Sequence, residues 1–516
     1  MSDDMKEKSE PASVAVHHHE QNPSLDTYVE LAAASRSREA SGEVSGGDSP
    51  DEKSSQTSHE RELDNARRAL RTAHWVSVFF LITTDILGPF NAPFALSQVG
   101  YVPGVILYVV MGAIACYTGL ILWKLFCHLD SHKYPIKTYS DLGHRILGNW
   151  FKHICTVLQS VQLIINVGTI CLSNAQSVEE IANNHKFCFS VAILMWALFG
   201  MVIGQIRTLK SYGWLANSAV WLNLIIIFTS MGFVAHAPPN YASAKAAYGI
   251  DPGPVQTAKF VSLPLFSKVN GIMNMVFAYG GAMIFPEFMA EMRRPMDFWK
   301  GMCCAQALIT VAYLLYGVYV YSFQGQFTLP LAYLGVSKYS WQTVGNALAL
   351  ITGIIAAGLY GNIGIKVAYY HVVEQWAKGP PLMSKRGRFL WTFMVIVYWA
   401  LAFIIASAIP QVQTIAGLVA AVCIMQFTYT FPPLLLAGYY MRIDAQVNDP
   451  GDTWRQWSRW RRGLFSGKWH YKWFNIFLFL GSAAMACLGM YGSGKAIQET
   501  FAIAGAATSF GCKSPV

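Results

Sequence analysis

Charged residues are scarce in this sequence. Asp, Glu, Lys and Arg make up only 13% of its 516 residues, whereas 53% are hydrophobic and 14% are aromatic. A soluble protein of this size needs more charge to solvate its surface. The composition therefore excludes most soluble classes and predicts that the lipid bilayer is the chain's main solvent and partner.

A concentrated basic surface is also lacking. The formal net charge is +9, but the Lys and Arg residues stand in short gaps between apolar runs. A nucleic-acid-binding domain gathers such residues on one face or stripe. We therefore expect no nucleic acid partner, and we interpret the basic residues as signs of membrane orientation.

The ten cysteines show no CxxC spacing typical of a zinc or redox site. Most of them fall within apolar runs, where Cys acts as a small apolar residue. Cys188 and Cys512 are expected near the extracytosolic face, and the sequence leaves open whether they pair. No paired histidine–carboxylate motif lies inside an apolar run. We therefore predict no metal, no cofactor, no catalytic residues and no enzymatic activity.

The first 70 residues lack the apolar content that a folded core needs. Stretches such as SGEVSGGDSPDEKSSQTS are rich in Ser, Gly, Asp and Glu, so residues 1–70 are predicted to form a disordered cytosolic tail. The tail also lacks the basic start and apolar core of a signal peptide, so the first apolar run must itself insert into the membrane.

Apolar runs that are long enough to cross a bilayer recur from His74 onward, at about twenty residues for each crossing. We predict eleven spans, at 75–99, 101–127, 150–178, 187–205, 212–236, 268–292, 299–323, 342–375, 388–409, 412–441 and 472–495. Several exceed the required length, which indicates tilt or breaks.

Basic residues are distributed unequally between alternate loops. One side holds Arg293, Arg294 and the cluster from Arg442 to Lys472, while the other side holds five lysines. Because basic loops stay cytosolic, we predict a cytosolic N-terminus and an extracytosolic C-terminus. The expected organisation is a tail (1–70), a ten-helix transport core (71–443), a basic cytosolic loop (444–471), an eleventh helix (472–495) and a short extracytosolic tail (496–516).

Helix breakers interrupt the first and sixth spans. Span 1 contains TTDILGPFNAPFAL and span 6 contains NMVFAYGGAMIFPEFMAEM. Proline lacks an N–H and clashes with the preceding turn, so a continuous helix is unfavourable at both places. Breaks in spans one and six are expected from a five-plus-five inverted repeat. The alternative is a pair of ordinary proline kinks in packed helices.

Each break exposes the polar ends of two half-helices. The second halves begin with unpaired N–H groups, which stabilise a carboxylate. The first halves end in free carbonyl groups, which attract a cation. An α-amino acid carries both charges and therefore suits this arrangement better than a sugar or a simple anion.

The strings TDILGPFNAPFALSQVGY, FAYGGAMIFPEFMAEMRRPMDFWK, YSDLGHRILG and GNIGIK resemble the amino acid/auxin permease (AAAP) family, and the pattern over residues 70–495 is similar to its fungal neutral amino acid permeases. The resemblance implies an all-α fold of the leucine-transporter type. It also implies proton-coupled symport, with the proton as coupling ion, of neutral aliphatic and aromatic amino acids.

The resemblance places the substrate against both breaks. It implies binding by Gly88, Pro89, Phe90 and Asn91 in span 1 and by Phe277, Ala278, Tyr279, Gly280 and Gly281 in span 6. Asn166 and Thr169 in span 3 are further candidates, although such residues often only bond to a neighbouring helix.

Ionisable residues inside spans are costly and are therefore candidates for coupling and gating. We single out Asp85, Lys366 and Glu287. Lys366 is expected to face Asp85 and to exchange a proton with it, and a permanent structural ion pair is the alternative. Glu287 is expected nearer the cytosolic gate, held by Arg293 or another basic residue.

Other functions with the same pocket stay open. The alternatives are a receptor or sensor that binds an amino acid without moving it, and a sodium-coupled or vacuolar amino acid transporter. We expect a multi-pass protein of the plasma membrane, with the vacuolar membrane as the second choice.

Overall fold

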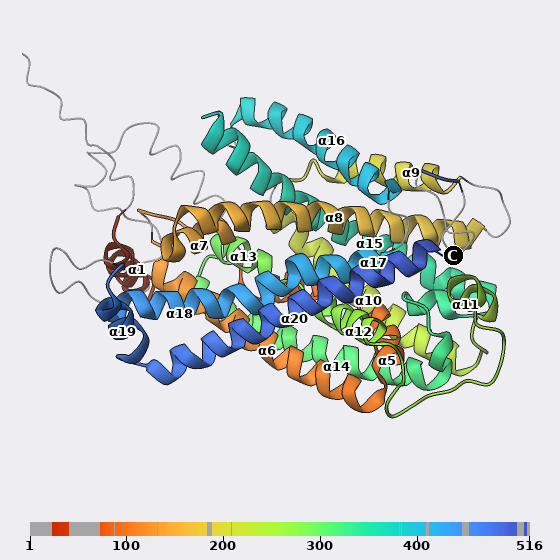
Figure 1. The fold of residues 1–516 in the computed structure, drawn as a ribbon. Helices are drawn as coiled ribbons and strands as arrows, with labels where there is room; N and C mark the ends of the chain where they lie inside the picture. Colours follow the sequence, from red (N-terminus) through yellow and green to blue (C-terminus); the bar gives the residue numbers. More distant parts are fainter. Residues whose placement is uncertain are drawn as a thin grey trace, which may run out of the picture.

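The computed structural model describes residues 23–40, 73–86, 88–131, 133–182, 188–207, 209–380, 382, 384–408, 412–445, 454–502 and 510–512. Over these residues the chain forms helices and two isolated β-bridges, and no strand. The helices lie roughly along one long axis (Figure 1). The α1 end of this bundle carries α1, α7 and α19, and the opposite end carries α11 and the C-terminus.

The described helices have the following bounds: α1 (Leu25–Ala40), α4 (Trp75–Ile86), α5 (Ala92–Val99), α6 (Tyr101–Leu129), α7 (Tyr139–Leu147), α8 (Asn149–Ala182), α9 (Phe189–Ile203), α10 (Leu209–Ala235), α11 (Tyr241–Tyr248), α12 (Leu265–Ala278), α13 (Phe285–Glu291), α14 (Phe298–Gln324), α15 (Tyr339–Ala368), α16 (Lys385–Ala408), α17 (Val412–Val419), α18 (Phe431–Asp444), α19 (Trp457–Phe465) and α20 (Trp469–Ala502). Short 3₁₀ turns are η1 (Pro89–Asn91), η2 (Ala282–Ile284), η3 (Pro295–Asp297), η4 (Gly325–Phe327) and η5 (Ala332–Gly335). Three π-helical turns are η6 (Tyr369–Trp376), η7 (Ala420–Ile424) and η8 (Gln426–Thr430).

Ten helical segments within the described residues are long and apolar enough to cross a membrane. They coincide with ten of the eleven predicted spans, so the all-helical fold class is confirmed. The predicted fourth span, 187–205, corresponds to α9, an apolar helix of 15 residues. At 1.5 Å per residue this helix is shorter than the hydrocarbon core of a bilayer.

The two interrupted spans form the centre of the bundle. In the most apolar stretch of each span, 73% of Trp75–Val99 and 89% of Leu265–Glu291 is buried, compared with 22% of Trp469–Glu499. Non-helical backbone is tolerated at membrane depth only where protein or a cavity covers it. The position of these spans therefore explains how the chain can carry two breaks.

The ends of the chain differ from the sequence prediction. The disordered tail predicted at 1–70 is wrong for residues 25–40, which form α1 against the end of α6; residues 1–22 and 41–72 lie outside the described residues. The predicted basic loop contains α19, and the last helix extends to Ala502. A disulfide joins Cys188 to Cys512, which answers the question that the sequence left open.

Candidate functional site

The first break lies between α4 and α5. Helix α4 ends at Ile86, a 3₁₀ turn covers Pro89–Asn91, and α5 begins at Ala92 with a proline in its first turn. The Asn91 Nδ2 donates to the carbonyl oxygen of Asn274 on α12 at 3.3 Å. This bond ties the break in span 1 to the first half of span 6.

The second break lies between α12 and α13. Helix α12 ends at Ala278, Tyr279–Gly281 form a turn, and η2 leads into α13 with Pro286 in its first turn. No side chain caps η2 or α13 through a hydrogen bond. Both breaks predicted from the prolines and glycines are therefore confirmed.

Two predicted glycines have different surroundings. Among the described residues, a Cβ added to Gly88 would come within 4 Å of the Phe90 ring alone, in ordinary van der Waals contact at 3.9 Å. A Cβ added to Gly280 would come within 2.9 Å of the Ile424 side chain. A methyl group would thus fit beside Gly88 without a close contact to a described residue, whereas the lack of a side chain at Gly280 allows η7 to approach span 6.

The aromatic residues that are predicted to bind substrate also differ in their surroundings. The Phe90 ring meets Tyr333 and Tyr316 edge-on, with centroids 5.1 and 5.9 Å apart. The Tyr279 hydroxyl donates to the Tyr108 carbonyl oxygen at 3.0 Å, and its ring lies between Tyr108 and Tyr313. Tyr279 is therefore held in the packing of α12 against α6 and α14, and its contact with substrate stays a prediction.

The remaining predicted binding residues lie in or beside the same two breaks. Pro89, Ala278 and Gly281 are buried, and Phe277 is half-buried. On α8, Thr169 donates to its own helix at Ile165 O. Their roles in binding stay predictions.

A polar face of α8 points at the second break. The Gln159 Nε2 donates to the Met283 carbonyl oxygen at 3.1 Å and to Glu287 Oε1 at 2.6 Å. One and two turns further along the same face are Gln162 and Asn166, both buried. Both amide atoms of Gln162 and the Asn166 Oδ1 have no hydrogen-bond partner among the described residues. Such atoms are costly to bury, so their presence indicates a ligand or water site.

Glu287 is part of this polar face rather than of a basic cluster. Its Oε1 also accepts from the Tyr139 backbone N–H at 3.4 Å, and its Oε2 is buried without a hydrogen-bond partner in the described part of the chain. The described residues contain no ion pair between Glu287 and Arg293. The expectation that Arg293 holds Glu287 is therefore wrong, because α8 and α7 supply the partners of its carboxylate.

Lys366 is paired with Glu291, at 2.7 Å between Nζ and Oε1. Glu291 ends α13, and its carbonyl oxygen accepts from the Ala73 N–H at the start of span 1. Glu291 thus joins span 6 to spans 1 and 8. The side chain of Asp85 lies outside the described residues, so its predicted pairing with Lys366 is not tested.

A cavity of about 330 Å³ lies beside this junction at the α1 end. Its lining comprises Ala73, His74, Trp75, Met292, Arg293, Arg294 and Asp297. The described residues contain no group of three or more His, Cys, Asp or Glu side chains that could hold a metal ion.

Comparison with known proteins identifies the family. The sequence model described as transmembrane amino acid transporter protein matches residues 71–456. The chain belongs to this family. With its ten span-length helices it is a multi-pass membrane protein.

Curated relatives of this family member come from fungi and plants. It is 22% identical to a "transmembrane transporter" of Fusarium pseudograminearum over 86% of this chain and 87% of the relative. It is 25% identical to the "N amino acid transport system protein" of Neurospora crassa over 70% of this chain and 74% of the relative. Among solved structures, the nucleobase-cation-symport-1 family transporter Mhp1 with bound bromovinylhydantoin covers 82% of this chain and 91% of its own, with 13% identity and a TM-score of 0.46.

Sequence reasoning missed several residues of this site. Gln159, Gln162 and Asn166 follow one another at intervals of three and four residues within an apolar run. This spacing places the three amides on one face of a helix, and it is the signal that could have revealed them. Glu291 was visible as an acidic residue one turn after Glu287, but nothing in the sequence showed its pairing with Lys366.

Proposed function

We propose that this chain is a secondary active transporter, not an enzyme, which moves neutral aliphatic and aromatic amino acids together with protons. Family membership supports amino acid transport. The observation that carries the proposal is the meeting of two broken helices at the centre of the bundle, beside buried amide atoms that have no partner among the described residues.

The geometry suits a zwitterion. The first turn of α5 follows Asn91, whose side chain makes no cap hydrogen bond there. Because Pro93 has no N–H and the Ala92 N–H donates to the Pro89 carbonyl oxygen, the N–H groups of Phe94 and Ala95 are the donors that we propose for a carboxylate. The Oδ1 atoms of Asn91 and Asn166, which have no hydrogen-bond partner among the described residues, can accept from an ammonium group. We propose that the apolar side chain of the substrate lies against Gly88 and the Phe90 ring, where a Cβ on Gly88 would make no contact with a described residue closer than 3.9 Å.

Glu287 is the group that we propose to carry the proton. It is 9% exposed, bonded through one oxygen, and has no cationic partner among the described residues. An ionised carboxylate is costly to bury without a cation, so this position suits a group that binds and releases a proton. Asp85 remains a further candidate for coupling.

The contacts that Glu291 makes with Lys366 and Ala73 suit a gate that closes the α1 end of the bundle. They join the first half of span 1, the second half of span 6 and span 8 at the α1 end. We propose that this end is cytosolic, as the basic loops indicate, and that the C-terminus is extracytosolic. Alternating access then requires the Ala73–Glu291–Lys366 junction to open. We assign the chain to the plasma membrane, with the vacuolar membrane as the alternative.

Competition for uptake tests the substrate class. Cells that express the chain should take up labelled leucine, and unlabelled neutral amino acids should compete, because the proposed pocket offers polar groups only for the backbone charges. Lysine, glutamate and glucose should compete poorly. Strong competition by lysine would contradict the apolar pocket, and binding of leucine without uptake would indicate a receptor.

A further inference from the structure

Helix α1 lies outside the part of the chain that the family model matches, yet it has one clearly buried face. Tyr28, Ala32 and Ser35 are 8%, 0% and 7% exposed, at the spacing of successive helical turns. Glu30 and Ser37 on the other face are exposed. A helix of 16 residues is only marginally stable alone in water, so tertiary contacts must hold it.

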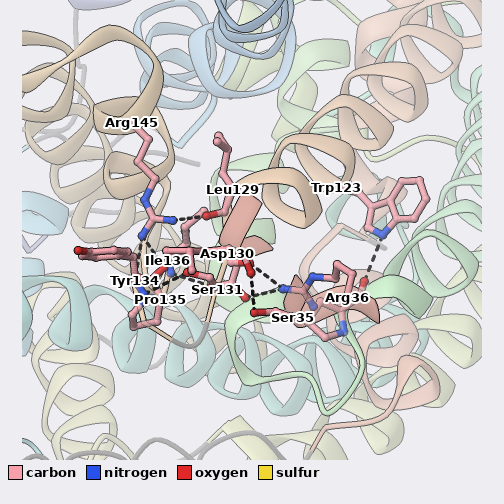
Figure 2. Close-up of polar contacts among 12 residues, drawn as sticks. Ser35, Arg36, Trp123, Leu129, Asp130, Ser131, Tyr134, Pro135, Ile136 and Arg145 are labelled. Atoms are coloured by element: carbon pink, nitrogen blue, oxygen red, sulfur yellow. Dashed lines mark hydrogen bonds and ion pairs between the residues drawn. The ribbon is translucent and has the colours of Figure 1, made fainter. Parts of the chain in front are cut away.

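The contacts of α1 centre on Asp130, which follows the last residue of α6. The Arg36 guanidinium donates to Asp130 Oδ2 at 2.7 Å and to the Asp130 carbonyl oxygen at 3.2 Å. Figure 2 shows Arg36 and Ser35 on one side of Asp130 and Tyr134, Pro135 and Ile136 on the other. The Asp130 side chain is fully buried, so this ion pair is shielded from solvent.

Tyr28 makes the second contact. Its ring meets the Tyr134 ring edge-on, with centroids 5.4 Å apart, and the Arg145 guanidinium lies over it at 4.6 Å. Burial raises the pKa of the Tyr28 hydroxyl, so the phenol is neutral and the contact with Arg145 is a cation–π interaction.

The groups that hold α1 also hold α7. Asp130 Oδ1 accepts from the Ile136 N–H at 2.9 Å. Arg145, on α7, donates to the carbonyl oxygens of Leu129, Tyr134 and Pro135, as Figure 2 shows. One set of charges therefore fixes α1, the loop after α6 and α7 together.

Helix α7 in turn contacts the broken span 6. It begins with a capping box formed by Thr138 and Asp141. Its first residue, Tyr139, donates through its backbone to Glu287 on α13 and through its hydroxyl to the Phe427 carbonyl oxygen. A continuous set of contacts thus leads from α1 to the residue that we assign to proton transfer.

We propose that α1 is an autoinhibitory strap: when it is docked on Asp130 and Tyr134, it holds α7 against α13 and slows the opening of the α1 end. This inference rests on the proposed function, because the rate that it controls is that of transport. Release of α1 loosens α7 and speeds the transport cycle.

The test compares full-length variants. Arg36→Gln removes the charge that pairs with Asp130, and Tyr28→Ala removes the ring between Tyr134 and Arg145. Glu30→Gln is the matched control on the exposed face of α1. Hydrogen exchange of residues 25–40 reports release of α1. Labelling of Cys155 by a membrane-permeant thiol reagent reports movement of α7, because this buried thiol lies close under Gly143 of α7.

We expect both variants to increase exchange in α1 and labelling of Cys155, and to raise the initial rate of leucine uptake about fivefold, the low end of ordinary coupling between sites. The control should match the wild type. Release of α1 with Cys155 still protected, unchanged α1 exchange in both variants, or an unchanged or lower uptake rate would each overturn the strap. If the wild type transports no neutral amino acid, the proposed function fails, and exchange and labelling still decide whether α1 holds α7.

Discussion

Single residues at the two breaks are specified partly by the sequence and partly by packing. Pro89, Pro93 and Pro286 indicate the breaks because each removes an N–H from its helix. The partner of Lys366 could not be predicted, since several acidic residues were available and only the packing of α13 against α15 selects Glu291. The same holds for Glu287, whose partners come from two other helices.

Gly88→Ala and Gly280→Ala should separate binding from folding. The methyl group at Gly88 would come no closer than 3.9 Å to any described residue, so the protein should fold and its KM for leucine should rise about tenfold, the effect of about one methylene in a pocket. The methyl group at Gly280 would press on Ile424, so the melting temperature should fall and the free energy of unfolding should decrease by about 1–3 kcal/mol. An unchanged KM for folded Gly88→Ala would contradict a substrate at the first break.

Glu287→Gln tests the proton carrier. The amide keeps the size of the side chain but cannot bind and release a proton, so accumulation driven by a pH gradient should be lost. Exchange of internal for external leucine should persist, because it needs no net proton movement. Accumulation and exchange are measured on the same vesicles. Gln159→Glu is not used as a control, because it would place a second carboxyl group beside Glu287. Normal pH-driven accumulation by Glu287→Gln would rule out this role.

At the scale of elements, long apolar runs with period-breaking prolines were predictable, whereas α1 was not. Its buried face consists of small and polar residues, Ala32 and Ser35 beside Tyr28, and carries little hydrophobic signal. What stabilises it is a charge and a ring on a loop about a hundred residues away, Asp130 and Tyr134. The predicted span 187–205 is longer than the 15 residues of α9, because the uncharged residues Phe187 and Cys188 before the helix and Gly204 and Gln205 after it were included in the span.

The junction of α13 with α15 should behave as a paired charge. Lys366→Met leaves Glu291 with a half-buried, unpaired carboxylate, so the free energy of unfolding should fall by about 2 kcal/mol, below the cost in a fully buried pair. Thermal melting in detergent measures this change. The exchanged pair, Lys366→Glu with Glu291→Lys, should recover part of the loss, and equal melting temperatures of Lys366→Met and the wild type would show that the pair does not hold the gate.

At the scale of the whole molecule, composition and long apolar runs predicted a multi-pass protein with eleven spans, and ten of these are span-length helices in the described residues. The disulfide between Cys188 and Cys512 was not predictable, because the two residues are 324 positions apart and only the folded bundle brings them together. Disulfides persist in oxidising compartments. The bridge therefore agrees with an extracytosolic position for the end of the bundle that carries the C-terminus.

Topology can be checked through this bridge in intact cells. An impermeant reductant added outside should open it and allow an impermeant thiol reagent to label Cys512, whereas the reagent alone should not. The double variant Cys188→Ser with Cys512→Ser is the control, since it removes both sulfur atoms of the bridge. A tag before residue 25 should become accessible to antibody only after permeabilisation. Access to that tag in intact cells would reverse the proposed orientation.

The central claim is that an amino acid bound between the two broken spans is moved together with a proton. The most direct measurement uses the purified chain in liposomes, with labelled leucine outside and the pH and sodium gradients imposed separately. We predict accumulation above the external concentration when the external solution is more acidic, its loss when a protonophore collapses the gradient, and no response to sodium. Accumulation driven by sodium alone, or no uptake under any gradient, would contradict the account.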